Sequence, residues 1–190
     1  HINISRAKYT IDYPCSFMFV ASMNPCPCGY YGDPTHNCVC TPGQIQRYMN
    51  KISGPLLDRI DIQCEISPVP FKDISKAAPG EPSARIRERV IRAREIQAER
   101  FKDFKGIHCN AQMTERMIHQ FAEPTEEGIN LLRMAMEKLS LSARAYNRIL
   151  KVARTIADLA GSQQVEPQHL AEAIGYRTLD RGDWAERGHF

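Results

Sequence analysis

The hydrophobic pattern of this sequence changes near residue 70, and that change limits the folds open to it. Before residue 70, apolar residues come in short runs rich in β-forming side chains; after it, they recur at helical spacing. Residues 16–23 predict a strand covered on both faces, and the alternating residues 60–66 predict a strand near a sheet edge. Because two strands cannot form an independent sheet domain, we expect the chain to begin inside a larger α/β domain.

The second part of the sequence predicts a bundle of about five helices. Its helix starts are marked by capping residues or by proline at the first helical position: Ser83, Thr114, Thr125, Ser142 and Glu166-Pro167. Gly161 fits a C-terminal cap. The first helix has an apolar face at helical spacing, made of Ile86, Val90, Ala93 and Ile96. A shorter helix is expected over 44–51.

The expected organisation is therefore an α/β fragment over 1–70, a Pro-rich linker over 71–82 and an all-α domain over 83–190, mainly α overall.

The net charge of +3 is too small to imply a nucleic-acid or membrane partner by itself. The longest apolar run, 17–23, is far shorter than the roughly 20 residues that span a bilayer. No secretory signal opens the chain, and seven cysteines cannot all pair, so we expect a reduced, cytoplasmic protein without a membrane partner.

Two polar residues of the first part are candidates for chemistry. Asn24 directly follows the run 16–23, and ligands of open parallel sheets gather at the carboxyl ends of strands; a simple Asn-Pro turn is the alternative. Arg59 stands just before the second predicted strand. It could form a surface salt bridge with Asp58 or Asp61, or present its planar guanidinium to a phosphate.

Two arginines begin the helix that Ser142 caps. Arg144 lies in the first turn, where a cation opposes the helix dipole. This placement is less surprising if an anion docks at the helix start, since the free N–H groups there would assist it. Arg148, one turn later, faces the same way. Solvated arginines on an exposed face explain the same pattern.

Three segments in this order resemble the magnesium-chelatase-like AAA+ ATPases, and among them the ComM/YifB group: residues 21–29 (ASMNPCPCG), 54–61 (GPLLDRID) and 142–146 (SARAY). The resemblance extends over nearly the whole chain, including 172–177 (EAIGYR). It implies that residues 1–70 are the end of an ATPase core and 83–190 its helical lid. It also implies ATP and magnesium as cofactors, and identical subunits in a hexameric ring.

The resemblance implies a role for each candidate. Asn24 corresponds to sensor 1, which orients the attacking water, and Arg59 to an arginine finger directed at the neighbouring subunit's nucleotide. Arg144 corresponds to sensor 2, which reaches the phosphates from the lid, with Arg148 beside it. The sequence has no Gly-x-x-x-x-Gly-Lys-Ser/Thr phosphate loop and no acidic strand end after one. We therefore expect the C-terminal portion of a longer ATPase, inactive by itself.

A cluster of cysteines follows Asn24. Cys26, Cys28, Cys38 and Cys40 bracket His36, and Zn²⁺ is bound tetrahedrally by such sets, although Cys-x-x-Cys is the commoner spacing. The ligands could be four cysteines, or three cysteines and His36. Reduced thiols in a loop, or a disulfide between the pairs after oxidation, are the alternatives. The other cysteines are expected to be core or incidental thiols: Cys15, Cys64 and Cys109.

DNA is a possible partner. Residues 83–105 carry eight basic side chains against four acidic ones, a pattern that also suits a solvated face or a subunit contact. Members of the resembled group act in DNA branch migration, and residues around Ser5 resemble one strand of a pore hairpin, with Arg6 and Lys8 as DNA contacts. Two alternatives to a DNA motor are a chelatase-type motor that inserts magnesium into a porphyrin, and a non-catalytic, zinc-stabilised nucleic-acid-binding module.

Overall fold

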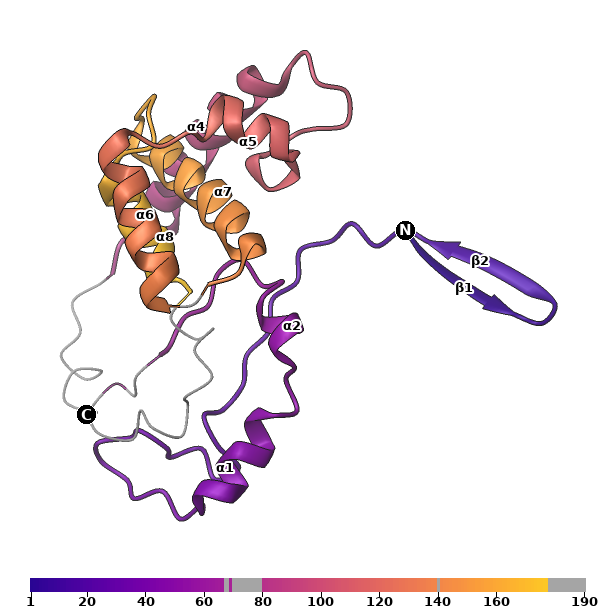
Figure 1. Ribbon diagram of the computed structural model, residues 1–190, viewed down its shortest axis with the longest axis vertical. Coiled ribbons are helices and arrows are strands. Elements are labelled where there is room, and N and C mark those ends of the chain that lie inside the picture. Colours follow the sequence, from indigo (N-terminus) through magenta and orange to yellow (C-terminus); the bar gives the residue numbers. More distant parts are fainter. Residues whose placement is uncertain (67–68, 70–79, 140, 178–190) are drawn as a thin grey trace.

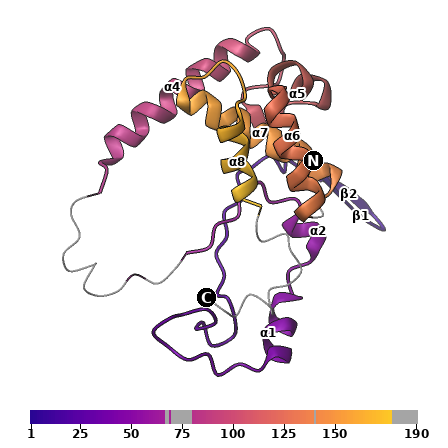
Figure 2. The same cartoon turned by 60° about the vertical axis from the view of Figure 1, so that its left-hand side comes forward.

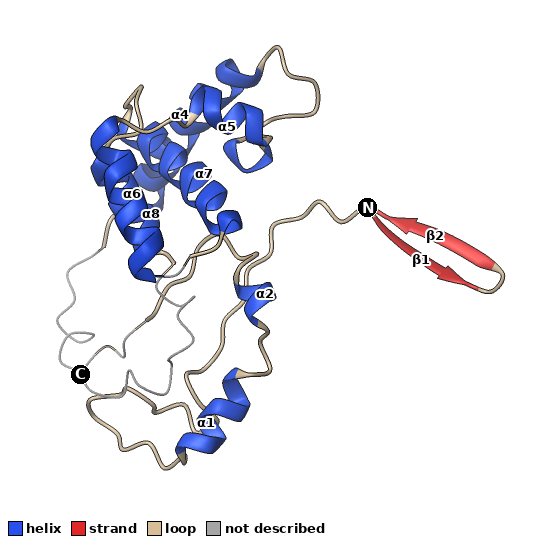
Figure 3. Ribbon diagram, in the orientation of Figure 1, coloured by secondary structure: helices blue, strands red, loops and turns tan. Residues whose placement is uncertain are grey.

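The structure, a computed structural model, describes residues 1–66, 69, 80–139 and 141–177. It consists of a β-hairpin, an extended segment with two short helices, and a helical domain (Figures 1 and 3). This arrangement agrees with the expected α/β fragment followed by an all-α domain. Most of the predicted linker lies outside the described residues, as does the end of the predicted helical domain. None of the described helices combines the length and the apolar character that a membrane crossing needs.

The hairpin joins β1 (Ile2–Arg6) to the antiparallel β2 (Tyr9–Tyr13). Arg6 pairs with Tyr9, so residues 7 and 8 form a two-residue turn at the tip. Asn3 Nδ2 donates to Asp12 Oδ1 across the strands, at 2.6 Å. Every strand residue is exposed, and the hairpin projects away from the helices (Figure 1). The strand expected around Arg6 is present.

The two strands predicted at 16–23 and 60–66 do not form in the described structure. Residues 16–23 run as exposed coil, with Met18 88% and Val20 80% exposed. A strand needs ladder partners and covering side chains, and the described residues offer this segment neither. In the second segment, the backbone N–H of Gln63 donates to Tyr176 O, at 3.0 Å, rather than to a strand.

Two short helices lie between these segments. α1 (Pro42–Met49) begins two residues before the predicted position because Thr41 and Gln44 form a reciprocal capping box. It buries Ile45 and Met49. α2 (Gly54–Leu57) is a single turn that leads directly into Asp58 and Arg59.

Ser83 does not cap the first helix, whose N-cap is Pro82, but among the described residues the helical domain has the five helices that the sequence predicted. They are α4 (Ser83–Phe101), α5 (Glu115–Phe121), α6 (Glu126–Leu139), α7 (Ala143–Ala160) and α8 (Pro167–Gly175), with a short 3-10 helix η1 (Asn110–Gln112). α7 packs against α4, α5, α8 and η1. Its Ile149 and Leu150 form one buried core with Ile118, Leu132 and Leu170.

Local capping signals are confirmed at both ends of α7. Ser142 Oγ accepts from the N–H of Ala145 at 3.1 Å, and Gly161 adopts the left-handed conformation at the C-cap, with φ +71°.

The buried face of α4 differs from the face that the sequence predicted. Ile86 and Val90 are exposed, whereas Gln97 and Phe101 are buried. The reason is that only the C-terminal half of α4 packs on the bundle, while its N-terminal half projects beyond it (Figure 2).

A buried carboxylate ties three elements of the bundle together. Asp158 on α7 accepts hydrogen bonds from Arg100 on α4 (2.7 and 2.5 Å), from Asn110 in η1 (2.8 Å) and from Arg154 on its own helix (3.1 Å). The side chains of Asp158 and Arg154 are 0% and 2% exposed. Arg154 also donates to the carbonyls of residues 162 and 163, which follow α7. Every charge is therefore paired, as burial requires.

We expect Asp158→Asn to lower the free energy of unfolding by about 3–5 kcal/mol, because it leaves two buried guanidinium groups without a counter-charge. Urea denaturation followed by circular dichroism measures this loss. The control is Glu99→Gln, which breaks the exposed pair with Lys102 on the same helix as Arg100 and should change stability little. Equal effects of the two substitutions would contradict a dominant role for Asp158.

Candidate functional site

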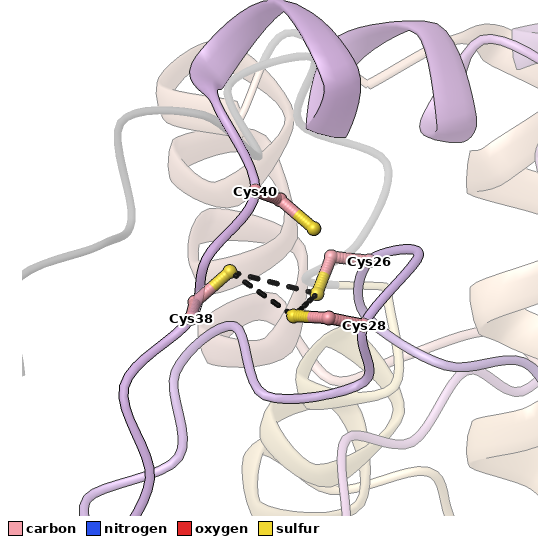
Figure 4. A group of neighbouring side chains, drawn as sticks. All are labelled: Cys26, Cys28, Cys38 and Cys40. Carbon is pink, nitrogen blue, oxygen red and sulfur yellow. Dashed lines mark hydrogen bonds between the residues drawn. The ribbon is translucent and has the colours of Figure 1, made fainter.

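Four thiols converge in the loop before α1. The Sγ atoms of Cys26 and Cys28 lie 3.3 Å apart, those of Cys28 and Cys38 3.5 Å, and those of Cys26 and Cys38 3.7 Å. Cys40 points toward the same centre (Figure 4), and all four sulfur atoms lie within 4.8 Å of one another. None of them forms a disulfide.

The backbone and α1 position these thiols. The N–H of Gly29 donates to Cys26 O at 3.1 Å, which closes a tight turn around the first pair, and Gly29 has φ +87°, a conformation that favours glycine. Cys40 directly precedes the Thr41 cap of α1. Cys26 is buried against Ile45 and Met49 of α1. The two cysteine pairs are thus held on either side of one helix start.

His36 does not join the cluster. Its Nδ1 atom lies 3.1 Å from Asp33 Oδ2 and 2.9 Å from Thr35 Oγ1, and its ring stacks on Tyr30 at 4.8 Å between centroids. The side chain is 60% exposed. Of the five predicted metal ligands, the structure therefore brings together the four cysteines and leaves His36 outside.

The thiols of the cluster differ in pKa. A hydrogen bond from the backbone of Tyr30, aided by those from Cys26 and from Val39, lowers the pKa of the Cys28 thiol to about 6. At Cys38 a backbone hydrogen bond from Cys40 acts in the same direction, but burial and the contacts with the other thiols outweigh it and raise the pKa to about 12. The surroundings therefore favour the thiolate form at Cys28 over that at Cys38.

Arg59 is exposed at the end of α2. Its Nη1 donates to Pro55 O at 2.9 Å. Neither salt bridge considered from the sequence forms, because Asp58 bonds Ser142 and Arg177, while Asp61 pairs with Arg148. Among the described residues, no ion pair engages the Arg59 guanidinium, which leaves it available at the surface.

The segment that carries Arg59 is anchored to the helical domain. Asp58 Oδ1 accepts from Ser142 Oγ at 3.0 Å and lies 3.5 Å from Arg177 Nη2. Arg177, buried at 1% exposed, also donates to the backbone oxygens of Ile60 and Asp58. The sequence did not predict that Arg177 anchors the Arg59 segment, although Arg177 ends the segment 172–177 that forms part of the family resemblance. The structure thus places Arg59 close to the start of α7.

Arg144 and Arg148, whose spacing places them on one side of α7, line one cavity. It measures about 270 Å³, and Asp61, Ala111, Asn147 and Lys151 complete its wall. Arg148 is paired with Asp61, and Lys151 Nζ donates to Ala111 O at 2.9 Å. Burial lowers the pKa of Lys151, against the opposing attraction of Asp61. With three cationic groups and one carboxylate, this cavity is suited to an anion such as a phosphate.

Asn24 lies apart from this cavity. It is exposed at the end of the extended segment, and its side chain packs beside Gly29 in the cysteine loop. Within the described residues, no hydrogen bond joins Asn24 to Arg59 or Arg144. The structure therefore brings Arg59 and Arg144 to neighbouring elements, and it ties the position of Asn24 to the thiol cluster.

Comparison with known proteins accounts for both parts of the chain. Residues 1–74 match the family "Magnesium chelatase, subunit ChlI", and residues 80–177 match "Magnesium chelatase, subunit ChlI C-terminal". The chain is 45% identical over 181 residues to the competence protein ComM of Haemophilus influenzae. It is 44% identical to the uncharacterized protein YifB of Escherichia coli and 35% identical to the uncharacterized protein Rv2897c of Mycobacterium tuberculosis.

These alignments cover 95%, 95% and 93% of the chain but only 34% of each relative. The chain thus spans about a third of the length of the relatives it matches. Both family matches follow the order of the two structural parts, with the boundary between residues 74 and 80. This chain belongs to the magnesium chelatase subunit ChlI family, of AAA+ kind, and within it resembles the ComM and YifB proteins.

Proposed function

We propose that this chain is the sensor, finger and lid portion of a ring-forming AAA+ ATPase that remodels DNA. One observation carries the proposal: Arg59 is exposed and without an ion pair among the described residues, while Asp58 beside it is bonded to the start of α7. An arginine whose segment is anchored to the helical domain, and whose guanidinium has no ion pair among the described residues, suits the neutralisation of charge on a phosphate outside its own subunit.

The nucleotide would be ATP with Mg²⁺, bound by the whole protein, and it supplies the phosphoryl group that is transferred to water. Phosphoryl transfer depends on positioning and on charge neutralisation more than on covalent help. In the proposed arrangement Arg144 meets the phosphates from the lid of the same subunit and Arg59 meets those of a neighbour, while Asn24 orients the water. A finger supplied to a neighbour implies head-to-tail contacts between identical subunits, which close into a ring; we propose six subunits.

The proposed DNA contact is the tip of the hairpin. Arg6, Lys8 and the 74% exposed Tyr9 lie together there, far from the helical domain (Figure 1). Cations that contact phosphates and aromatic rings that stack on bases are the usual means of holding a nucleic-acid strand. The name of the relative ComM, a competence protein, supports this substrate. The seven free cysteines favour the cytoplasm.

A chelatase-type motor that inserts magnesium into a porphyrin is the second candidate, and the description of the matched family favours it. The two candidates differ in what stimulates ATP turnover. DNA should stimulate a remodelling motor, whereas a chelatase motor should respond to its partner subunits and porphyrin.

In the intact protein, Arg59→Ala should lower the rate of ATP turnover about 10³–10⁵-fold without weakening nucleotide binding. Arg92→Ala is a matched control, because Arg92 is also an exposed arginine that donates to a carbonyl four residues earlier. Steady-state turnover and fluorescent-nucleotide titration measure the two effects. Unchanged turnover in Arg59→Ala would exclude Arg59 as the finger, whereas no turnover in the wild type would favour a non-catalytic, zinc-stabilised nucleic-acid-binding module.

Mixing two inactive variants tests whether the finger acts between subunits. Arg59→Ala subunits keep Asn24, and Asn24→Ala subunits keep Arg59. A random 1:1 ring therefore rebuilds a complete site at about one interface in four, because each site draws on two neighbouring subunits. We expect turnover to return to roughly that fraction of the wild-type rate. If the mixed rings stay as inactive as their components, Arg59 does not act in trans.

Replacing Arg6 and Lys8 together by alanine should weaken DNA binding to a similar degree for all sequences. It should also reduce the slope of log affinity against log salt concentration by about one for each cation lost. Fluorescence anisotropy over a salt series measures both. The control removes two exposed arginines of α4, Arg87 and Arg94. A larger loss in the control would place the DNA on α4 instead of the hairpin.

A further inference from the structure

We propose that Cys26, Cys28, Cys38 and Cys40 bind one structural Zn²⁺ as four thiolates, without His36. Zinc binds thiolate sulfur at about 2.3 Å, so the sulfur atoms of a regular tetrahedral site lie about 3.8 Å apart. Three of the sulfur pairs are 3.3, 3.5 and 3.7 Å apart, and all four atoms fall within 4.8 Å. Two of the thiols come from each side of the loop and surround one centre (Figure 4).

The donor set selects the metal. Four sulfur atoms in a tetrahedral arrangement favour zinc or an iron–sulfur centre, whereas oxygen-rich sites favour magnesium or calcium. His36 is left out by its position: the four sulfur atoms form the group by themselves, whereas the His36 ring is 60% exposed and stacks on Tyr30. With four protein ligands the site has no open position, which is typical of structural zinc rather than of catalytic zinc.

The charges around the cluster suit a metal–thiolate complex. Four thiolates around Zn²⁺ carry a net charge of −2. A cavity of about 730 Å³ opens beside Cys28 and Cys40, and Arg47 and Lys51 line it. These two cations, both from α1 or its end, thus line the same cavity as two of the proposed ligands, and their charge is opposite in sign to that of the complex.

The loop has only a small hydrophobic core. Among the described residues this core buries Cys26 with Ile45 and Met49 of α1, and Cys28, Cys38 and Cys40 pack around them together with two tyrosines. Between residue 24 and the Thr41 cap, no helix or strand is present in the described structure. Ordering a segment of this length costs conformational entropy that so small a core cannot offset. A bound metal supplies the missing stabilisation.

Metal analysis of the chain, purified without added metal, tests the proposal directly. Inductively coupled plasma mass spectrometry should find about one zinc per chain and no stoichiometric iron. Cys28→Ser and Cys38→Ser should each lose most of the zinc. His36→Ala and Cys64→Ser, which remove an excluded side chain and an exposed thiol, should retain it. Less than a tenth of an equivalent of zinc in the wild type, or its loss in His36→Ala, would overturn the proposal.

A second measurement covers the case in which the cysteine variants do not fold. Wild-type chain reconstituted with Co²⁺ should show the intense thiolate charge-transfer bands and the visible bands of a tetrahedral four-sulfur site. Chelation should then accelerate protease cleavage within residues 29–37 and leave the helical domain intact. An octahedral Co²⁺ spectrum, or cleavage unaffected by chelation, would count against the site. None of these readouts depends on ATP turnover, so failure here is distinguishable from failure of the proposed motor.

Discussion

A single buried guanidinium fixes the relation between the two parts of the chain. Arg177 lies at the end of the helical domain, yet its hydrogen bonds go to Ile60 and Asp58, more than one hundred residues earlier. Burying this charge removes its hydration, and the hydrogen bonds to these backbone oxygens and to the Asp58 carboxylate offset that cost. Without Arg177 those acceptors would lose their partners at the point where the Arg59 segment meets α7 and α8.

The same junction links the two arginines that would face phosphates. Ser142 caps α7 through Ala145 and at the same time donates to Asp58. Arg148, one turn after Arg144, pairs with Asp61. A rotation of α7 therefore either carries the Arg59 segment with it or breaks these contacts. In a ring of such subunits, this coupling would join the state of one nucleotide site to the next.

Sequence reasoning succeeded where the determining interactions are local. The Ser142 cap, Gly161 and the five helices depend on residues within one or two turns, so their signals can be read directly. It failed where the determinant is distant. Arg100 looked like part of a basic face, but its guanidinium pairs with Asp158, 58 residues later, and its side chain is only 13% exposed. The run 16–23 has the pattern of a strand, but pairing depends on neighbours that no pattern within the run supplies.

The candidate site shows the same contrast between features with a sequence signal and features set by distant contacts. Cysteine spacing identified the four thiols, but only the contacts of His36 with Asp33, Thr35 and Tyr30 separate it from them. The roles of Asn24, Arg59 and Arg144 came from family resemblance, because each residue alone fits a surface position equally well. Different parts of the structure hold these three residues in position. Asn24 is two residues from Cys26 and depends on the loop, whereas Arg59 and Arg144 depend on the packed helices. Asn24 and Arg59 are thus held by independent anchors, so loss of either anchor would misplace one of these residues while the other kept its position.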